Sequence, residues 1–330
     1  MQPFEYASPR TREQAVRLLG VDPAAAAPLA GGSDLLGLMK DGIETPRRLV
    51  SLKDVEGLVG VRSDSGGLRI GALTTIDALA ADAALAWEHP MVAKAAAHVA
   101  GPQIRNVATV GGNLCQRPRC WYFRNGYGLL AQRDGKSMVT DGDNRYHAIL
   151  GNDGPALFVQ PSTLAPLLVA VGAQVALVGP QGERRIELAA FYRIPRKEGE
   201  REHDLRPGEI LTELLLPPAA GRKIASYEVR QRETLDWSLA TAAVALEMDG
   251  IKVNRARIVL GQVAPIPWNA TEAEELLRGK ILDAALIAQA GQNAVIKARA
   301  LSQNRYKIQL ARVAVQRALR SAAGMMETEG

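Results

Sequence analysis

The chain has 330 residues, of which 47% are hydrophobic and 23% are charged, and its formal net charge is +5. This length predicts two or three domains, and two cysteines can neither staple a small secreted fold nor alone hold zinc or an iron–sulfur cluster. The mild charge and the 5% aromatic content argue against a nucleic-acid partner. No apolar run reaches the 18 residues of a membrane span, and no signal peptide is recognisable. We therefore expect a cytoplasmic protein that does not insert into a membrane. Export to the periplasm together with a partner that carries the signal stays open.

The N-terminal part alternates helix and strand signals. Residues Thr11 to Gln14 form a capping box that predicts a helix start. The segment from Pro28 to Leu36 contains a few apolar residues, then two glycines, and then a second predicted helix start. Strands are predicted downstream, over 48–52, 58–62 and 68–73.

Alanine-rich sequence over 77–99 predicts two helices separated by Pro90. Residues 115–155 are polar, rich in glycine and arginine, and poorly periodic, which is typical of a functional segment or an insertion. The strongly charged residues 196–208 predict an exposed loop. Between these two segments, apolar strands and a helix are predicted over 164–178 and 186–191.

The pattern changes after the Pro217-Pro218 pair, and we place a domain boundary near 218–222. Three sheet strands are predicted beyond it, over 225–232, 240–248 and 256–263. A helical region begins at Thr271, and the composition over 283–323 is almost wholly helical.

Two short motifs match nucleotide-binding fingerprints but fail on context. Gly126 to Ala131 fits a relaxed dinucleotide fingerprint, yet no clean strand precedes it and Gly135 follows too soon for a helix. Gly135-Lys136-Ser137 fits the end of a phosphate loop, but Leu130 stands where that loop requires its first glycine.

Two glycine-rich turns, Ala30 to Asp34 and Thr109 to Asn113, are stronger candidates for a binding site. Glycine lets backbone N–H groups approach an anion, and successive N–H groups form an anion-binding concavity. Ser33, Thr109 and Asn113 add side-chain hydrogen bonds. Two such loops could grip one extended diphosphate cofactor between them. The alternative is that each is merely a tight strand–helix connection.

A series of motifs then points to a known family. The motifs are Phe4/Tyr6/Pro9, Ala30 to Leu36, Ile70 to Thr75, Gln103 to Asn106 running into Thr109 to Leu114, and Leu260 to Pro267. In this order they resemble the FAD-binding medium subunit of the xanthine dehydrogenase and carbon monoxide dehydrogenase family over essentially the whole chain. The insertion around 119–124 and 144–151 is most similar to aldehyde oxidoreductase medium subunits.

The resemblance implies an α+β fold in two domains. Residues 1–218 would form a two-lobed FAD-binding domain of the vanillyl-alcohol-oxidase type, with lobes of about 1–57 and 58–218 and an insertion of about 115–155. Residues 222–325 would form a C-terminal domain of the CO dehydrogenase flavoprotein type, with a three-stranded antiparallel sheet and a helical bundle.

The resemblance also implies the electron-transfer subunit of a heterotrimeric molybdenum hydroxylase, most like an aldehyde oxidoreductase. A large subunit with the molybdenum cofactor would oxidise the substrate, and a small subunit would pass electrons through 2Fe-2S clusters. This chain would carry non-covalent FAD and deliver the electrons to an external acceptor, with no catalytic residue and no metal of its own. Two alternatives stay open, a stand-alone FAD oxidoreductase of the same fold and a non-catalytic scaffold that has lost FAD.

The family motifs imply which residues contact FAD. The first loop would contribute Leu29, Ala30, Gly31, Gly32, Ser33, Asp34, Leu35 and Leu36. The second loop would contribute Thr109, Gly111, Gly112 and Asn113. Near the flavin ring the resemblance places Val99, Ala100, Ser162 and either Ile210 or Leu211.

Two positions depart from the family pattern near the flavin. Thr163 stands where many relatives have an aspartate, so that a contact is lost or taken over by Ser162. Glu228 stands where a lysine is common, so that a cation is missing unless Arg230 or Arg232 replaces it.

The cysteines are a third departure. Some relatives hold a 4Fe-4S cluster in this insertion with four cysteines, and Cys120 matches that context, with Cys115 five residues before it. No cysteine follows over 126–141, so we do not expect a 4Fe-4S cluster here. The expectation is two free thiols packed near the flavin and a structural, hydrogen-bonded His147.

Overall fold

The computed structural model describes residues 1–232 and 236–325. The first lobe is built on parallel strands in the order β1 (Glu5–Ala7), β3 (Arg48–Ser51) and β2 (Ala26–Leu29). Helix α1 (Arg12–Leu19) packs on this sheet and begins with the predicted capping box, in which Thr11 accepts from the backbone N–H of Gln14. Helix α2 (Leu35–Lys40) follows β2 after the first glycine loop, so this loop connects a strand to a helix.

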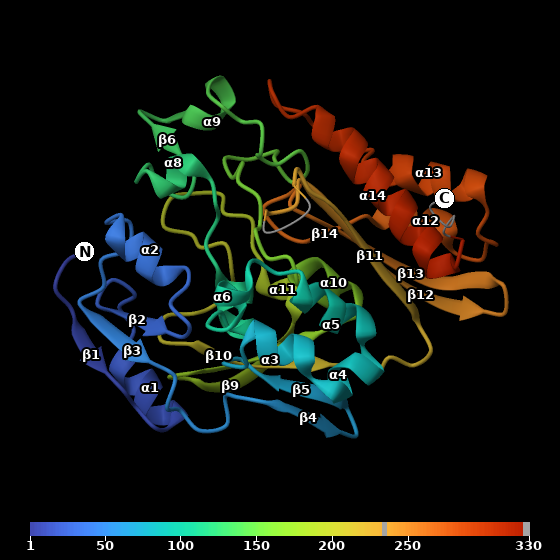
Figure 1. The fold of residues 1–330 in the computed structure, drawn as a ribbon. Coiled ribbons are helices and arrows are strands. Elements are labelled where there is room, and N and C mark those ends of the chain that lie inside the picture. Colours follow the sequence, from blue (N-terminus) through green and yellow to red (C-terminus); the bar gives the residue numbers. More distant parts are fainter. Residues whose placement is uncertain (233–235, 326–330) are drawn as a thin grey trace.

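The second lobe is an antiparallel sheet whose strand order departs from chain order. The strands run β4 (Val61–Asp64), β5 (Gly67–Gly71), β10 (Ile210–Leu216), β8 (Gln174–Gly179) and β9 (Gly182–Glu187). Figure 1 shows the helices that follow β5 gathered beside this sheet. They are α3 (Ile76–Ala81), α4 (Ala83–Glu88), α5 (Pro90–Ala97), α6 (Pro102–Arg105) and α7 (Val110–Cys115).

The two helices predicted over 77–99 are therefore three. Pro90 does begin a helix, because it is the first residue of α5, where its missing N–H costs nothing. The additional break lies at Asp82, whose carboxylate caps α4 by accepting from the N–H of Leu85 at 2.8 Å.

The predicted insertion contains short elements only. These are α8 (Trp121–Arg124), β6 (Gln132–Arg133), β7 (Lys136–Ser137) and α9 (Met138–Asp141). In Figure 1 the insertion stands above the two lobes, close to α2 and to the C-terminal domain. The lobe resumes at α10 (Ala165–Ala170), and α11 (Leu188–Phe191) follows β9.

The C-terminal domain has one strand more than the three predicted. Antiparallel strands β11 (Lys223–Val229), β12 (Ala240–Asp249) and β13 (Lys252–Gly261) are joined by short β14 (Trp268–Asn269), which pairs with β13 after the chain turns back through a proline-rich segment. Helices α12 (Thr271–Leu277) and α14 (Tyr306–Ala323) pack on this sheet, and α13 (Ala284–Ala294) packs against both helices. Within the described residues, no helix is both long and apolar enough to cross a bilayer.

The predicted helical run over 283–323 is broken between α13 and α14 by contacts to the insertion. The side-chain amide of Asn304 donates to the carbonyls of His147 and Ala148, and Ser302 accepts from Asn144 at 2.8 Å. These hydrogen bonds fix residues 295–305 in a non-helical path and tie the C-terminal domain to the insertion.

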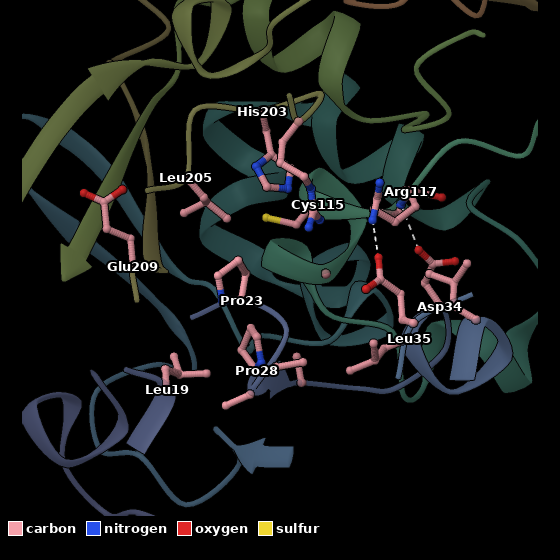
Figure 2. A pocket seen from close by; sticks show the side chains of 18 of the residues that line it. Leu19, Pro23, Pro28, Asp34, Leu35, Cys115, Arg117, His203, Leu205 and Glu209 are labelled. Carbon is pink, nitrogen blue, oxygen red and sulfur yellow. Dashed lines mark hydrogen bonds and ion pairs between the residues drawn. The ribbon is translucent and has the colours of Figure 1, made fainter. Parts of the chain in front are cut away.

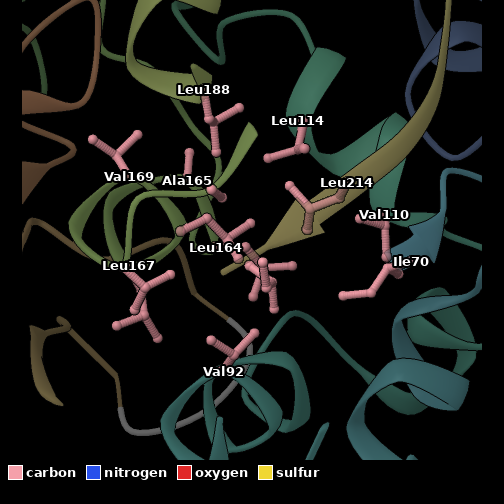
Figure 3. Close-up of a cluster of buried hydrophobic side chains, with 14 of the residues drawn as sticks. Ile70, Val92, Val110, Leu114, Leu164, Ala165, Leu167, Val169, Leu188 and Leu214 are labelled. Carbon is pink, nitrogen blue, oxygen red and sulfur yellow. The ribbon is translucent and has the colours of Figure 1, made fainter. Parts of the chain in front are cut away.

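Helix α10 joins the two domains through their hydrophobic cores. All six of its residues are buried, and Leu164, Leu167 and Val169 lie in the core shown in Figure 3. That core also contains Val259 of β13, so the C-terminal sheet packs directly on the second lobe. Burial of this apolar surface fixes the relative position of the domains.

Candidate functional site

The first glycine loop presents free backbone N–H groups. It leaves β2 after Leu29 and enters α2 at Leu35, with Gly32 in the left-handed region at φ +76°. In the described part of the chain, no oxygen accepts from the N–H groups of Gly31, Gly32 or Ser33. Unpaired N–H groups in a row are suited to an anion. The loop therefore has the donors that the sequence predicted.

The second glycine loop differs, because its N–H groups are already bonded within the protein. Gly111 donates to Ala72 O at 2.8 Å, Gly112 to the Thr109 hydroxyl at 3.1 Å and Asn113 to Thr109 O at 2.8 Å. Thr109 thus caps α7, and its own hydroxyl proton is left to donate. This loop contributes a rigid wall and a hydroxyl rather than a set of backbone donors.

At Gly31 the first loop packs against the backbone that leads into the second loop. A Cβ added there would lie 2.8 Å from the carbonyl carbon of Val107 and 3.2 Å from Cα of Ala108, and closer still to the Val107 oxygen. Only glycine lets the first loop approach the second so closely. Gly31 is therefore required for the packing of one loop on the other, whatever it binds.

Both loops open into a cleft of about 460 Å³ between the lobes, within the size range of ligand sites. Its walls come from residues 19–44 of the first lobe, 109–117 after the second loop, and 199–209 (Figure 2). The predicted residues that line it are Ala30, Gly31, Gly32, Ser33, Asp34, Leu35, Thr109 and Gly112. The structure thus brings together two loops that are about 80 residues apart in the chain.

The other predicted contact residues are not part of the cleft wall. Asn113 and Ser162 are buried and joined by a 2.6 Å hydrogen bond from the serine hydroxyl. The remaining ones do not line the cleft and are Leu29, Leu36, Val99, Ala100, Gly111, Ile210 and Leu211. Among them Val99 and Leu211 belong to the core of the second lobe and Ile210 to that of the first. Direct contacts of these residues with the flavin stay a prediction.

A buried charged cluster at the cleft was missed by sequence reasoning. Arg117 pairs with Glu44 and with Glu202, and Glu202 and His203 are buried although 196–208 was predicted to be an exposed loop. Burial alone would raise the pKa of Glu202, but nearby positive charge, that of Arg117 above all, outweighs it and lowers that pKa. Burial lowers the pKa of His203 to about 4. With this pKa the imidazole is neutral at pH 7. Its ring stacks on Phe191 with centroids 5.5 Å apart, which indicates a structural role.

The two thiols lie on opposite sides of this region. Cys115 faces the cleft (Figure 2), and burial raises its pKa to about 12. The Cys120 sulfur lies 3.1 Å from Nε2 of His147, where burial raises the thiol pKa and lowers the pKa of His147 to about 4. Both thiols are therefore protonated at neutral pH. Among the described residues, no three His, Cys, Asp or Glu side chains are grouped as a metal site.

A second cavity, of about 470 Å³, lies between the insertion and the C-terminal domain. Aromatic and apolar side chains form much of its wall, among them Trp121, Tyr146, Phe158, Pro161 and Trp237. Arg119 connects it to the cleft, because its guanidinium bonds Asp34 at 2.7 Å and stacks over the Trp237 ring at 5.0 Å. Arg119 thus joins the wall of the cavity to the wall of the cleft.

Glu228, which departs from the family pattern, lies near this second cavity, because it bonds Ser238 of the cavity wall. The Glu228 carboxylate accepts from Arg230 at 2.8 Å and from the Ser238 hydroxyl, so Arg230 is neutralised rather than free to replace a lysine. Arg232 lines the cavity, with Asp236 3.7 Å away. Lys307 is buried and donates to the carbonyls of Tyr146, His147 and Gln262.

Comparison with known proteins gives a consistent result over the whole chain. Residues 2–219 match the model of the FAD binding domain in molybdopterin dehydrogenase, and residues 225–322 match the CO dehydrogenase flavoprotein C-terminal domain. The aldehyde oxidoreductase FAD-binding subunit PaoB of Escherichia coli K12 is 35% identical, over 84% of this chain and 86% of its own length. The carbon monoxide dehydrogenase medium chain of Afipia carboxidovorans is 34% identical, over 85% and 81%. The structure of CO dehydrogenase from Oligotropha carboxidovorans superposes with a TM-score of 0.76 at 29% identity, over 99% of this chain and 100% of its own.

Proposed function

Since the chain belongs to the FAD-binding subunits of the molybdopterin dehydrogenase family, we propose that it works in a complex with a molybdenum-cofactor subunit and a 2Fe-2S subunit. In that complex it receives electrons from the iron–sulfur subunit and passes them through FAD to an external acceptor. The expected fold and cofactor class are confirmed, apart from the additional strand β14. The observation that carries the proposal is the meeting of the two glycine loops at one cleft.

The residues of the cleft fit the diphosphate of FAD. The free N–H groups of Gly31, Gly32 and Ser33 would bind its oxygens, and the Thr109 hydroxyl would donate from the opposite side. The adenosine end would lie against apolar side chains deeper in the cleft, such as Leu19, Pro23 and Leu205. When bound, FAD supplies the ability to accept and release electrons; the chain supplies the position and the electrostatic surroundings.

The flavin end is proposed to reach toward the second cavity. The apolar and aromatic walls of that cavity suit an isoalloxazine ring, and Arg119 stands where the cavity adjoins the cleft. The opening of the cavity between the insertion and the C-terminal domain would expose one edge of the ring to an external acceptor. The aldehyde class of substrate rests on the insertion and on the similarity to the Escherichia coli subunit.

The test is to purify the chain with its partners and to ask what reduces its flavin. Acid treatment should release FAD, since the binding is non-covalent. Under anaerobic conditions an aldehyde should bleach the flavin absorbance of the complete complex. The same aldehyde should leave the flavin of the isolated chain oxidised, while dithionite reduces both.

Three results would contradict the proposal. An acid supernatant without flavin would show that the chain has lost FAD and acts as a scaffold. Turnover of substrate by the isolated chain would identify a stand-alone oxidoreductase. A complete complex that reduces its flavin with another class of substrate would overturn the aldehyde assignment alone.

A further inference from the structure

The carboxylate of Asp34, a residue of the cleft wall, is bonded to residues of the insertion. Its Oδ2 accepts from the backbone N–H of Arg117 at 2.8 Å. Its Oδ1 accepts from Arg124 at 2.8 Å and forms an ion pair with Arg119 at 2.7 Å. Figure 2 shows Asp34 beside Arg117, at the rim of the cleft. Asp34 precedes α2, yet it makes no cap hydrogen bond to that helix, so its acceptor capacity is directed to residues 117–124.

The partners of Asp34 are themselves held in place. Arg124 also donates to the carbonyls of Arg117 and Pro118, at 3.0 and 2.8 Å, which closes the segment 117–124 around the carboxylate. Arg119 stacks over Trp237 of the C-terminal domain. One side chain of the first lobe is thus joined to the insertion and, through Arg119, to the C-terminal domain. Few of these groups are open to solvent, so the ion pairs are weakly screened.

A carboxylate next to a diphosphate-binding loop is unfavourable on charge alone, because it repels the anion that the loop must hold. Asp34, Arg119 and Arg124 together carry a net charge of about +1, by formal count. Removal of the carboxylate would raise that charge and should favour an anion if Asp34 acted through charge only. The presence of Asp34 at this place needs a reason other than charge.

We propose that Asp34 is a positioning residue that holds the start of the insertion against the first glycine loop. Three groups of residues 117–124 hold its carboxylate in place. The fixed position of Asp34 in turn fixes the backbone conformation of Gly31, Gly32 and Ser33, which immediately precede it. The N–H groups of the loop are then in place before the cofactor arrives, which lowers the ordering cost of binding. The proposal rests on the placement of the FAD diphosphate at this loop. It gives the insertion a role that requires no metal cluster.

The test is the substitution Asp34→Asn, because charge and positioning predict opposite results. The asparagine removes the negative charge, so both ion pairs are lost, and its NH₂ group faces arginine donors, so at least one hydrogen bond is lost as well. When FAD is titrated into the flavin-free full chain, we expect its dissociation constant to be about tenfold higher or more in the variant. This is the usual effect of losing a charged hydrogen bond. Titration of FAD fluorescence measures it. An unchanged or lower dissociation constant overturns the proposal.

The matched control is Asp143→Asn. Asp143 also pairs with an arginine of the insertion, Arg145, at 2.7 Å, but this pair is exposed and does not touch the first lobe. Its FAD affinity should equal that of the unmodified chain.

A second measurement applies if Asp34→Asn binds no FAD at all. Amide hydrogen exchange of the flavin-free chain should become faster over both 31–36 and 117–124 in Asp34→Asn, and over neither in Asp143→Asn. Unchanged exchange in Asp34→Asn overturns the proposal. Gly31→Ala separates the two levels of inference. If it leaves FAD binding unchanged, the placement of the diphosphate fails and the positioning role fails with it. If Gly31→Ala weakens binding and Asp34→Asn does not, only the positioning role fails.

Discussion

The substitution Gly31→Ala tests whether the contact between the two glycine loops creates the FAD site. A methyl group at residue 31 would lie 2.8 Å from the carbonyl carbon of Val107, below the 3.0 Å that real Cβ atoms respect, and closer still to the Val107 oxygen. The obstacle is the backbone immediately before the second loop, and α7 and the hydrogen bond from Gly111 to Ala72 hold that loop in place. The first loop must therefore move away from the second.

The expected cost is that of inserting one methyl group into a packed contact, about 1–3 kcal/mol. In the flavin-free chain the loops relieve the clash by separating, so FAD has to bring them back together and pays this cost on binding. The dissociation constant of FAD should therefore rise by about 5- to 150-fold, at about 1.4 kcal/mol per tenfold change.

Isothermal titration of the flavin-free chain with FAD measures this change, and thermal unfolding in the absence of FAD checks that the fold is retained. The matched control is Gly37→Ala in α2, where an added Cβ meets no atom within 4 Å. Equal FAD affinities of the two variants would refute the argument that the loop contact forms the site.

Three further predictions concern the buried groups. The pKa of His203 is lowered to about 4 in the folded chain, against an ordinary value of 6.5. The unfolded state therefore binds the proton first, and the free energy of unfolding falls as the pH drops from 6.5 to about 4. The loss is about 3 kcal/mol, and urea unfolding of His203→Phe should show a smaller acid dependence; an identical one would contradict the assignment. Since burial raises the pKa of Cys115 to about 12, this thiol should react with iodoacetamide at pH 8 far more slowly in the native chain than after unfolding, as mass spectrometry would show; full native labelling would speak against it. Finally, the purified chain should contain FAD without iron, and a count of about four irons and four sulfides per chain would show a cluster that we do not expect.

Local signals made the positions of most elements predictable. The capping box at Thr11, the glycines of the two loops and the alternation of the C-terminal strands act within a few residues, so the sequence alone identifies them. Breaks that depend on distant partners were not predictable. The non-helical path over 295–305 exists because Asn304 bonds the insertion more than 150 residues earlier in the chain. Strand β14 has two residues and is defined by its pairing with β13.

The candidate site was predictable in its glycines and not in its charges. A row of charged residues over 196–208 is typical of solvent exposure, yet Glu202 and His203 are buried because Arg117 and Phe191 lie opposite them. Arg117 lies about 85 residues away in sequence, and a single sequence contains no signal for such a pairing. For the same reason the sequence did not show that the Asp34 carboxylate bonds the insertion, and the contact of Asp34 with the cofactor stays a prediction.

The two loops differ in how much they depend on the cofactor. The N–H groups of the second loop are bonded to Ala72 and Thr109, so this loop has its final shape without a ligand. The first loop has unpaired N–H groups, and its shape depends on Gly31 packing against Val107 and on Asp34 bonding the insertion. Unpaired donors favour an anion only while the loop is held in the binding conformation. The contacts that surround the first loop are therefore expected to control FAD affinity more strongly than substitutions that alter the hydrogen bonds inside the second.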